Sequence, residues 1–459
     1  MKRKSILFVT LCLALCLIPS VGMLFFPTTQ TTENRPMAAA PQLIMEGKLN
    51  KNFVADLESY ITDHLALRNQ MIYADAKVQT GLFGESNVSN VISGTDGWLY
   101  YASTLDDYLG VNPMSERQLY NLAHNFGIMQ AYVEARGMDF LLTITPNKNT
   151  LYAENMPYYK DYQVGELHNA VALAPYLAQE GVRYLDLFRL FGEQEEVLYL
   201  KRDSHWNNKG ACLAYNGIMD AMELPHEDYS GITPKAVKND NGDLNKMLYS
   251  FYGELEENYD YGLTQNYVYR NDVKSVEDGF IVTENKAGQG SMLMFRDSFG
   301  NTLIPFLSNE FAMSCYSKGV PHALERFAES YEPDCVVIQK VERNLAEYLE
   351  TPPILTAPEG ELPGAYSIRS TDSTAEIADC LNDMNYYCIS GTVDPSCLDT
   401  DSQILVWVDG TAYQAYHTGE NGYLLYLKKA ALQAAEAAVE VYVLDDTCVQ
   451  VLAEKIPLS

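Results

Sequence analysis

The stretch SMLMFRDSFG, residues 291–300, decides the fold prediction for this chain. Its first half, up to Phe295, is short and apolar, as expected of a buried strand, and a helix-compatible run begins at Gly300. Ser298 is therefore expected on a turn between a strand and a helix. In open α/β sheets the carboxyl ends of the strands are where ligands bind, so this serine is a candidate functional residue.

Helical and strand periods alternate on both sides of this stretch, from about residue 43 to residue 350. Ser115 begins a predicted helix, and a short apolar strand follows at Phe140–Ile144. A further strand is predicted at Val182–Leu187, and a buried strand at Cys335–Ile338. Strands that are separated by helices need crossover connections, so we predict an α/β fold with a mostly parallel sheet flanked by helices.

The remaining segments differ in composition from this region. Residues 1–26 are predicted to be a membrane anchor or signal peptide, and residues 27–42, rich in Thr, Pro and Ala, a linker. Beyond Pro352-Pro353 the pattern becomes β-rich, with a hairpin predicted around Asp409-Gly410. We predict that residues 355–459 form a small all-β, sandwich-like domain next to a 43–350 domain.

The N-terminal segment indicates export. Three basic residues, Lys2 to Lys4, precede an uncharged run from Ser5 to Phe26. As a helix this run would span about 33 Å, close to the ~30 Å hydrocarbon core of a bilayer. The basic flank is expected in the cytoplasm and everything after the run outside it. A cell-membrane anchor and a cleaved signal peptide, which would give a secreted protein, both fit; the length of the run favours the anchor.

Bulk composition limits the possible functions. The chain has 459 residues, too many for a single hydrophobic core, with 47% hydrophobic and 20% charged residues, typical of globular proteins. Its formal net charge of −29 argues against nucleic acid as a partner, because phosphate binding needs a basic surface. A neutral glycan or a small acyl carrier fits better, although such acidity can also serve only to keep a surface protein soluble.

A second short segment supplies an acid and a base. Asp203 and His205 lie two residues apart, which in an extended segment places both side chains on one side. An imidazole that a carboxylate orients can take the proton of a serine hydroxyl at neutral pH. We therefore predict a catalytic triad of Ser298, His205 and Asp203. Taken alone, an Asp-x-His pair arises easily by chance, and Asp-Ser pairs are common in turns.

Four further residues are candidates for the substrate or oxyanion site. Amides at the start of the helix after Ser298 can hold an oxyanion, and Asn147 is a candidate side-chain donor to it. Lys148 could orient the acyl group or glycan, Trp206 is expected to wall the pocket, and Arg296 to narrow it. Asn147 and Lys148 could equally be helix-cap residues after Pro146. No metal site and no cofactor are predicted.

Several motifs occur in an order that resembles the DHHW family and the related alginate O-acetylation proteins, permuted members of the SGNH hydrolase superfamily. The resemblance spans roughly residues 33 to 346 and rests on these landmarks: Glu33-Asn34-Arg35, Asp63-His64, Gly97-Trp98-Leu99-Tyr100, Pro146-Asn147-Lys148, Asp203-x-His205-Trp206, Gly242-Asp243-Leu244, Asp297-Ser298-Phe299 and Val341-Glu342-Arg343-Asn344. It implies an SGNH-like sheet and gives Asp203, His205 and Ser298 the triad roles. Ser204 departs from the histidine of the family name, and Arg296 from a usual glycine.

The resemblance also implies a function. It points to an extracytoplasmic O-acetyltransferase that modifies a cell-surface or secreted polysaccharide, with acetyl groups supplied by a polytopic membrane O-acyltransferase. An acetyl esterase that uses the same residues with water as acceptor is the first alternative. A non-catalytic glycan-binding or assembly protein is the second.

Overall fold

The computed structural model describes residues 2–31, 36–45, 47–165, 168–432 and 434–458. The landmark Glu33-Asn34-Arg35 lies outside the described residues.

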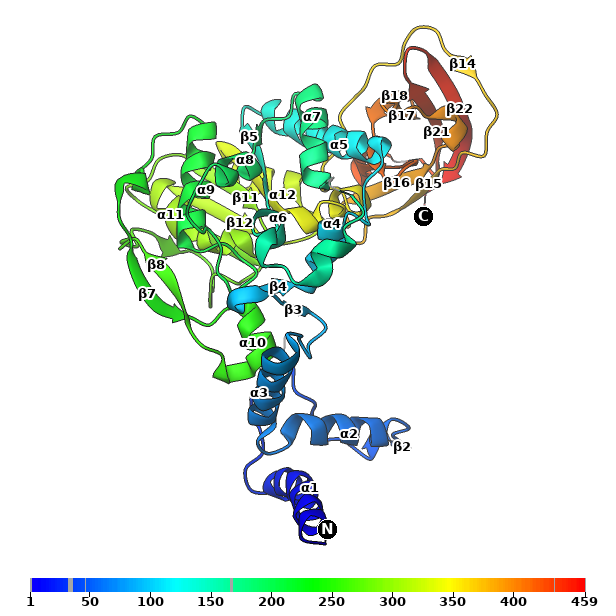
Figure 1. Ribbon diagram of the computed structural model, residues 1–459. Coiled ribbons are helices and arrows are strands. Elements are labelled where there is room, and N and C mark those ends of the chain that lie inside the picture. Colours follow the sequence, from blue (N-terminus) through cyan, green and yellow to red (C-terminus); the bar gives the residue numbers. More distant parts are fainter. Residues whose placement is uncertain (1, 32–35, 46, 166–167, 433, 459) are drawn as a thin grey trace.

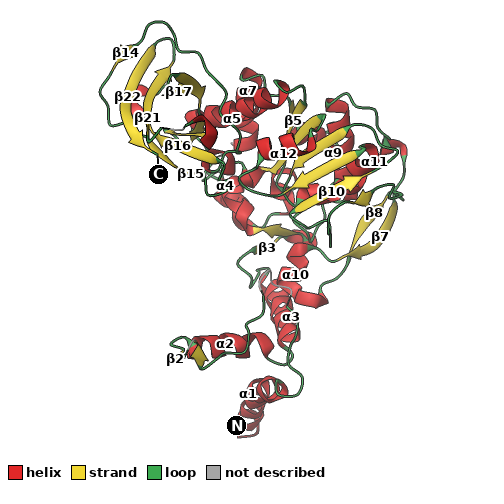
Figure 2. Ribbon diagram, turned by 180° about the vertical axis from the view of Figure 1, so that it is seen from behind, coloured by secondary structure: helices red, strands yellow, loops and turns green. Residues whose placement is uncertain are grey.

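A seven-stranded sheet forms the centre of the molecule (Figure 2). Its strand order is β6 (Tyr184–Leu185), β5 (Asp139–Thr145), β13 (Cys335–Val341), β11 (Ser291–Phe295), β12 (Met313–Ser317), β10 (Phe280–Glu284) and β9 (Val268–Tyr269). The first five strands pair in parallel, and β10 and β9 add an antiparallel edge. The predicted α/β fold with a mostly parallel sheet is confirmed.

Helices cover both faces of this sheet, because its central strands are apolar on both sides. Phe140, Leu142 and Ile144 of β5 point into one core, and Leu141 points into the other. The first core is closed by α5 (Glu116–Glu134), α7 (Asn169–Gln179), α12 (Leu324–Tyr331) and α13 (Glu347–Glu350). The second is closed by α8 (Leu187–Gly192), α9 (Asn208–Ala221) and α11 (Ile304–Glu310).

Residues 224–290, which contain few helix signals in sequence, form a structured excursion. Strands β7 (Lys235–Asp240) and β8 (Glu256–Asp260) pair as an antiparallel hairpin whose connection holds helix α10 (Asp243–Tyr249). Leu244 and Leu248 of α10 pack with Ala76 of α3 (Arg68–Val78) and with two small strands, β3 (Val91–Ser93) and β4 (Leu99–Tyr101). The excursion therefore connects the body of the protein to its N-terminal stem.

The stem extends from one end of the molecule (Figure 1). It comprises α1 (Lys2–Gly22), the short strands β1 (Ile44–Met45) and β2 (Lys48–Leu49), α2 (Phe53–His64) and α3. Within α1, residues Arg3–Gly22 are long and apolar enough to cross a membrane. An N-terminal helix of this kind serves either as an anchor or as a signal sequence.

The C-terminal part is a β-sandwich, as predicted (Figure 1). One sheet has the order β14 (Ser367–Ile368), β22 (Cys448–Pro457), β21 (Glu436–Leu444), β17 (Gln403–Val408) and β18 (Thr411–Gln414). The other has the order β15 (Glu376–Asp379), β16 (Tyr386–Thr392), β20 (Gly422–Lys428) and β19 (Tyr416–Thr418). The hairpin predicted around Asp409-Gly410 is β17–β18, and the chain then crosses to the other sheet at β19.

Helix α5 holds the sandwich through buried polar contacts. Asn125 Nδ2 donates to the carbonyls of Tyr348 (3.0 Å) and His417 (2.8 Å), and its Oδ1 accepts from the His417 amide (2.8 Å). Asn121 Oδ1 faces Nδ1 of the His417 ring at 2.9 Å. Because the backbone and ring of His417 would lose these partners if the sandwich moved away, the junction fixes one arrangement.

Candidate active site

Ser298 lies on the predicted strand-to-helix turn. β11 ends at Phe295, a 3-10 helix (Phe299–Thr302) begins directly after the serine, and α11 follows. Asp297 fixes this turn: its Oδ1 accepts from the Phe299 amide (2.9 Å) and from Gln339 Nε2 (3.0 Å), and its Oδ2 accepts from the Val341 amide (2.7 Å). The neighbouring strand β13 thereby determines where the hydroxyl points.

Asp203 and His205 come together differently from the expectation. Residues 201–205 form bends and not an extended segment. Asp203 Oδ1 accepts from the His205 amide at 2.9 Å, a local turn that brings the ring back to the carboxylate. The spacing was informative, but the physical reason is a side-chain-to-backbone turn and not strand alternation.

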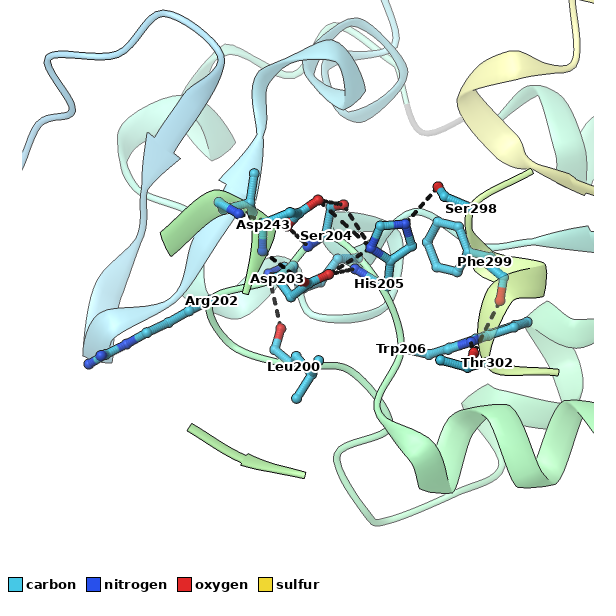
Figure 3. A network of polar contacts seen from close by, with 12 residues as sticks. Leu200, Arg202, Asp203, Ser204, His205, Trp206, Asp243, Ser298, Phe299 and Thr302 are labelled. Carbon is cyan, nitrogen blue, oxygen red and sulfur yellow. Dashed lines mark hydrogen bonds and ion pairs between the residues drawn. The ribbon is translucent and has the colours of Figure 1, made fainter. Parts of the chain in front are cut away.

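The structure brings Asp203, His205 and Ser298 into one hydrogen-bonded line (Figure 3). His205 Nδ1 lies 2.6 Å from Asp203 Oδ1, and Nε2 lies 2.7 Å from Ser298 Oγ. An ionised carboxylate can only accept, so Nδ1 carries the ring proton and the Nε2 lone pair of the neutral ring faces the serine hydroxyl. The His205 side chain is 22% exposed, which leaves the line within reach of a substrate.

The charges around the ring favour its protonated form. Burial raises the pKa of Asp203, but the facing His205 and the amides of Asp243 and His205 outweigh this effect and lower it well below its usual range. Burial lowers the pKa of His205, but the carboxylates of Asp203 and Asp243 outweigh this effect and raise it above 6.5. The nearby guanidinium of Arg343 acts in the opposite direction on this pKa. A ring in this environment can accept a proton from a hydroxyl and hold it.

Lys148 does not orient a substrate in this structure. Its side chain is buried, and Nζ donates to the carbonyls of Leu200 (3.1 Å), Lys201 (3.0 Å) and Asp203 (2.6 Å). Burial lowers its pKa to about 8. All three acceptors belong to the bend that carries Asp203, so the lysine fixes the acid and the substrate-contact prediction is corrected.

Asn147 is likewise engaged elsewhere. It is fully buried, its Nδ2 donates to Asp107 Oδ2 (3.0 Å), and its backbone amide donates to Glu342 Oε2 (2.9 Å). Its Oδ1 accepts from Arg343 at 3.3 Å. The side chain is fully buried and one of its two N–H donors is held by a carboxylate, so the structure does not present Asn147 as the predicted side-chain oxyanion donor.

The side chains of Trp206 and Arg296 are buried against the turn that carries Ser298 and do not line a pocket. Trp206 is 1% exposed, packs edge-on against the Phe299 ring, and donates from Nε1 to Thr302 Oγ1. Arg296 is 2% exposed and donates to the carbonyls of Asp297, Val276 and Asp278. The predictions that these side chains wall or narrow the pocket are therefore corrected: both are structural supports.

Two functional candidates were not assigned from the sequence. Asp243, at the start of α10, has its Oδ2 3.7 Å from His205 Nδ1 (Figure 3). The guanidinium of Arg343 lies 5.8 Å from the Phe299 ring, directly beside the serine turn. Both belong to the ordered landmarks, Gly242-Asp243-Leu244 and Val341-Glu342-Arg343-Asn344, which was the signal that could have found them.

Within the described parts of the chain, Asp203, His205 and Asp243 form the one group whose carboxylate and imidazole atoms lie close enough to suggest a metal site. The nitrogen that faces the two carboxylates is the one that carries the proton in the arrangement above. Both carboxylates also accept backbone amides, from His205, Ser204 and Asp243. The donor set therefore fits a hydrogen-bonded acid–base group.

Comparisons with solved structures return several proteins of low identity. Bacillus cereus PatB1 is 16% identical with a TM-score of 0.42, over 57% of this chain and 96% of that chain. A DHHW family protein from Eubacterium siraeum is 14% identical with a TM-score of 0.41, over 56% and 94%. The O-acetyltransferase domain of Pseudomonas putida AlgJ is 16% identical with a TM-score of 0.38, over 56% and 92%. No curated protein matches the chain.

One family model matches a segment of the chain that carries part of the site. The matched segment, residues 91–287, contains Asp203, His205 and Asp243 and ends before Ser298. The resemblance predicted from the motif order is confirmed: residues 91–287 match the family described as the SGNH hydrolase-like domain of the acetyltransferase AlgX.

Proposed function

We propose that this protein is an extracytoplasmic O-acetyltransferase that modifies a cell-surface or secreted polysaccharide through an acetyl-serine intermediate. Ser298 is the nucleophile, His205 the general base and acid, and Asp203 the group that orients the ring. Residues 43–350 form the catalytic unit and residues 355–459 an attached β-rich unit. The observation that carries the proposal is the line from Asp203 Oδ1 through the His205 ring to Ser298 Oγ, with contacts of 2.6 and 2.7 Å.

In the first half of the reaction, Ser298 takes the acetyl group from an ester donor. Ser298 Oγ attacks the acetyl carbonyl carbon while its proton passes to His205 Nε2. The bond between the acetyl carbon and the donor oxygen then breaks, and that oxygen takes the proton from Nε2. The products are acetylated Ser298 and the free donor alcohol.

In the second half, a sugar hydroxyl replaces the donor alcohol. It gives its proton to His205 Nε2 and attacks the acetyl carbon; the bond to Ser298 Oγ breaks, and this oxygen recovers the proton. The negative charge that develops on the carbonyl oxygen in both halves needs hydrogen-bond donors nearby. Of the backbone amides at the start of the 3-10 helix after Ser298, the Gly300 amide is suited to this, because the Phe299 amide already donates to Asp297 Oδ1 and the Asn301 amide to the Ser298 carbonyl.

The N-terminal helix supports the cellular location in this proposal. Residues Arg3–Gly22 can span a membrane, with the catalytic unit outside the cytoplasm. An acetyl donor made in the cytoplasm would have to cross the same membrane. We therefore include a polytopic membrane O-acyltransferase as the partner that supplies acetyl groups, and a glycan as the acceptor.

The test uses the full-length protein with p-nitrophenyl acetate as donor and an oligosaccharide as acceptor. Ser298→Ala should lower kcat by on the order of 10⁶ if Ser298 is the nucleophile. Ser59→Ala, an exposed serine on α2, is the matched control and should retain full activity. Mass spectrometry of the wild-type protein should detect an acetyl group on Ser298.

The products separate the proposal from its alternatives. Acetylated oligosaccharide formed faster than free acetate supports the transferase. Free acetate alone would make the protein an esterase. An active Ser298→Ala protein would remove the nucleophile assignment, and glycan binding without turnover in the wild type would favour a binding or assembly protein.

A further inference from the structure

A second carboxylate faces the same nitrogen of His205 as Asp203 does. Asp243 Oδ2 lies 3.7 Å from His205 Nδ1, and Asp203 Oδ1 lies 2.6 Å from it. The reaction proposed above uses only one carboxylate at this position. The two acids come from different segments. Asp203 lies in the bend between Tyr199 and Trp206, which form an isolated β-bridge, and Asp243 is the first residue of α10. The tertiary fold therefore brings the two carboxylates together.

Ser204 connects this second carboxylate to the ring. Its amide donates to Asp243 Oδ1 at 2.7 Å, and its hydroxyl donates to Asp243 Oδ2. The same hydroxyl oxygen lies 3.3 Å from His205 Nδ1. Ser204 is 6% exposed, so it is shielded from solvent and holds the Asp243 carboxylate in one orientation.

The backbone of Asp243 supports the first acid as well. Its amide donates to Asp203 Oδ2 at 2.6 Å, while Asp203 Oδ1 is the oxygen that faces the ring. One residue thus orients the primary carboxylate through its main chain and approaches the imidazole through its side chain. Helix α10 is held in place for this, because Leu244 and Leu248 are buried and Tyr249 bonds Thr80 beyond the end of α3.

We propose that Asp243, held by Ser204, is a positioning residue for the general base of this site. This inference rests on the proposed function. Asp243 fixes the orientation of the His205 ring together with Asp203, and its negative charge stabilises the imidazolium that forms when Ser298 gives up its proton. Asp243 does not touch the reacting atoms, since it lies on the side of the ring opposite Ser298.

The charged groups that face the ring determine the sign of the expected effect. They are Asp203 from the bend, Asp243 from α10 and Arg343 from the 3-10 helix Glu342–Asn344, with Lys148 behind Asp203. The two carboxylates raise the pKa of His205, and the Arg343 guanidinium lowers it. Removing the charge of Asp243 should therefore make the ring easier to deprotonate and a weaker base.

The test compares Asp243→Asn with Asp260→Asn in the full-length protein. Asp260 lies on the same hairpin and its Oδ1 accepts from the Gly262 amide (2.8 Å), so this variant removes one negative charge that is not among the groups acting on the His205 ring. We expect Asp243→Asn to lower kcat about 10- to 100-fold, the loss typical of one charge-assisted contact, with little change in KM. Its acid limb in a profile of kcat/KM against pH should move to lower pH, whereas Asp260→Asn should match the wild type.

Ser204→Ala provides a second route to the same answer. It removes the hydroxyl and keeps the amide that holds Asp243, so a smaller loss of kcat is expected, with the acid limb of the wild type retained. Should Asp243→Asn fail to fold, Asp243→Glu keeps the charge and displaces the carboxylate: kcat should fall while the limb stays nearer to that of the wild type.

Each outcome bears on one of the two proposals. If Asp243→Asn and Ser204→Ala both give the kcat and the acid limb of Asp260→Asn, the positioning role is refuted while the triad stands. If Asp243→Asn lowers activity with no change in the pH profile, its role is only structural and the inference is again refuted. An active Ser298→Ala protein refutes the proposed function itself, whatever Asp243→Asn does.

Discussion

Replacing Gly242 with alanine should disable the site without replacing any residue of the proposed triad. Gly242 precedes α10 and packs directly on the bend that carries Asp203. A Cβ built on this glycine would lie 2.2 Å from the Arg202 carbonyl oxygen, 2.5 Å from its carbon and 2.9 Å from the Asp203 amide nitrogen. All three are backbone atoms, so no side-chain rotation can relieve the contact.

The size of the effect follows from the hydrogen bonds across this gap. Ordinary van der Waals contact begins at 3.4 Å, so the two backbones must separate by roughly 1 Å. Two hydrogen bonds cross this gap. The Asp243 amide donates to Asp203 Oδ2 (2.6 Å), and the Asn245 amide donates to the Arg202 carbonyl (3.0 Å). Losing one charge-assisted and one neutral hydrogen bond should cost about 2–4 kcal/mol of unfolding free energy. A displacement of about 1 Å at the acid should lower kcat/KM about 100-fold.

Thermal unfolding and esterase kinetics on p-nitrophenyl acetate measure the two effects. Gly231→Ala is the matched control, because this glycine lies in the same excursion and its Cβ would meet open space. It should leave both the melting temperature and kcat/KM unchanged. If Gly242→Ala also shows wild-type stability and turnover, the close support of Asp203 by the α10 segment is not required, and the reasoning fails.

Three further predictions concern pH and the domain junction. Because two carboxylates raise the pKa of His205 above its usual value of 6.5 and the neutral ring is the proposed base, the acid limb of kcat/KM should be centred above pH 6.5; a limb centred below pH 6.5 would contradict this. Burial lowers the pKa of His322 to about 3, so its contribution to stability is present above pH 6.5 and declines as pH falls toward 3. Between pH 7 and pH 5 the wild type should therefore lose about 2 kcal/mol of unfolding free energy through this ring. In urea titrations, the loss of unfolding free energy for His322→Gln over the same range should be smaller by about 2 kcal/mol. Asn125→Ala leaves the His417 amide and two carbonyls without partners, and should lower the unfolding free energy by about 2–4 kcal/mol. Proteolysis of the native protein should then detect a loosened sandwich, and unchanged protection would contradict the prediction.

The elements with strong periodicity were predictable from the sequence. β5 and β13 each contain an apolar run, Phe140–Leu142 and Cys335–Ile338, and the helix that begins after Ser115 starts with a capping box at Ser115 and Gln118. These local signals agree with the tertiary fold. The spacing of Asp203 and His205 and the turn at Ser298 were sufficient to name the three residues that the structure brings together.

The roles of the surrounding residues could not be read in the same way. Lys148 and Asn147 follow a strand end next to the site, but which way each side chain turns depends on the carbonyls and carboxylates of other segments. The partner of Arg296 is a loop about twenty residues earlier in the chain. Asp243, forty residues after Asp203 in the sequence, approaches His205 because α10 docks on the stem. Such contacts depend on tertiary packing, which no local pattern contains.

The packing of α10 on α3 has a practical consequence for preparing a soluble fragment. Deleting the apolar N-terminus is the usual route to crystals of such a protein, and a start near residue 84 would remove all of α3. Leu244 and Leu248 would then lose Ala76 as a neighbour, and Tyr249 would lose Thr80. A fragment that keeps Arg68 onward retains this scaffold. Inactivity of a fragment that begins after α3 would therefore reflect the truncation and not the chemistry of the site.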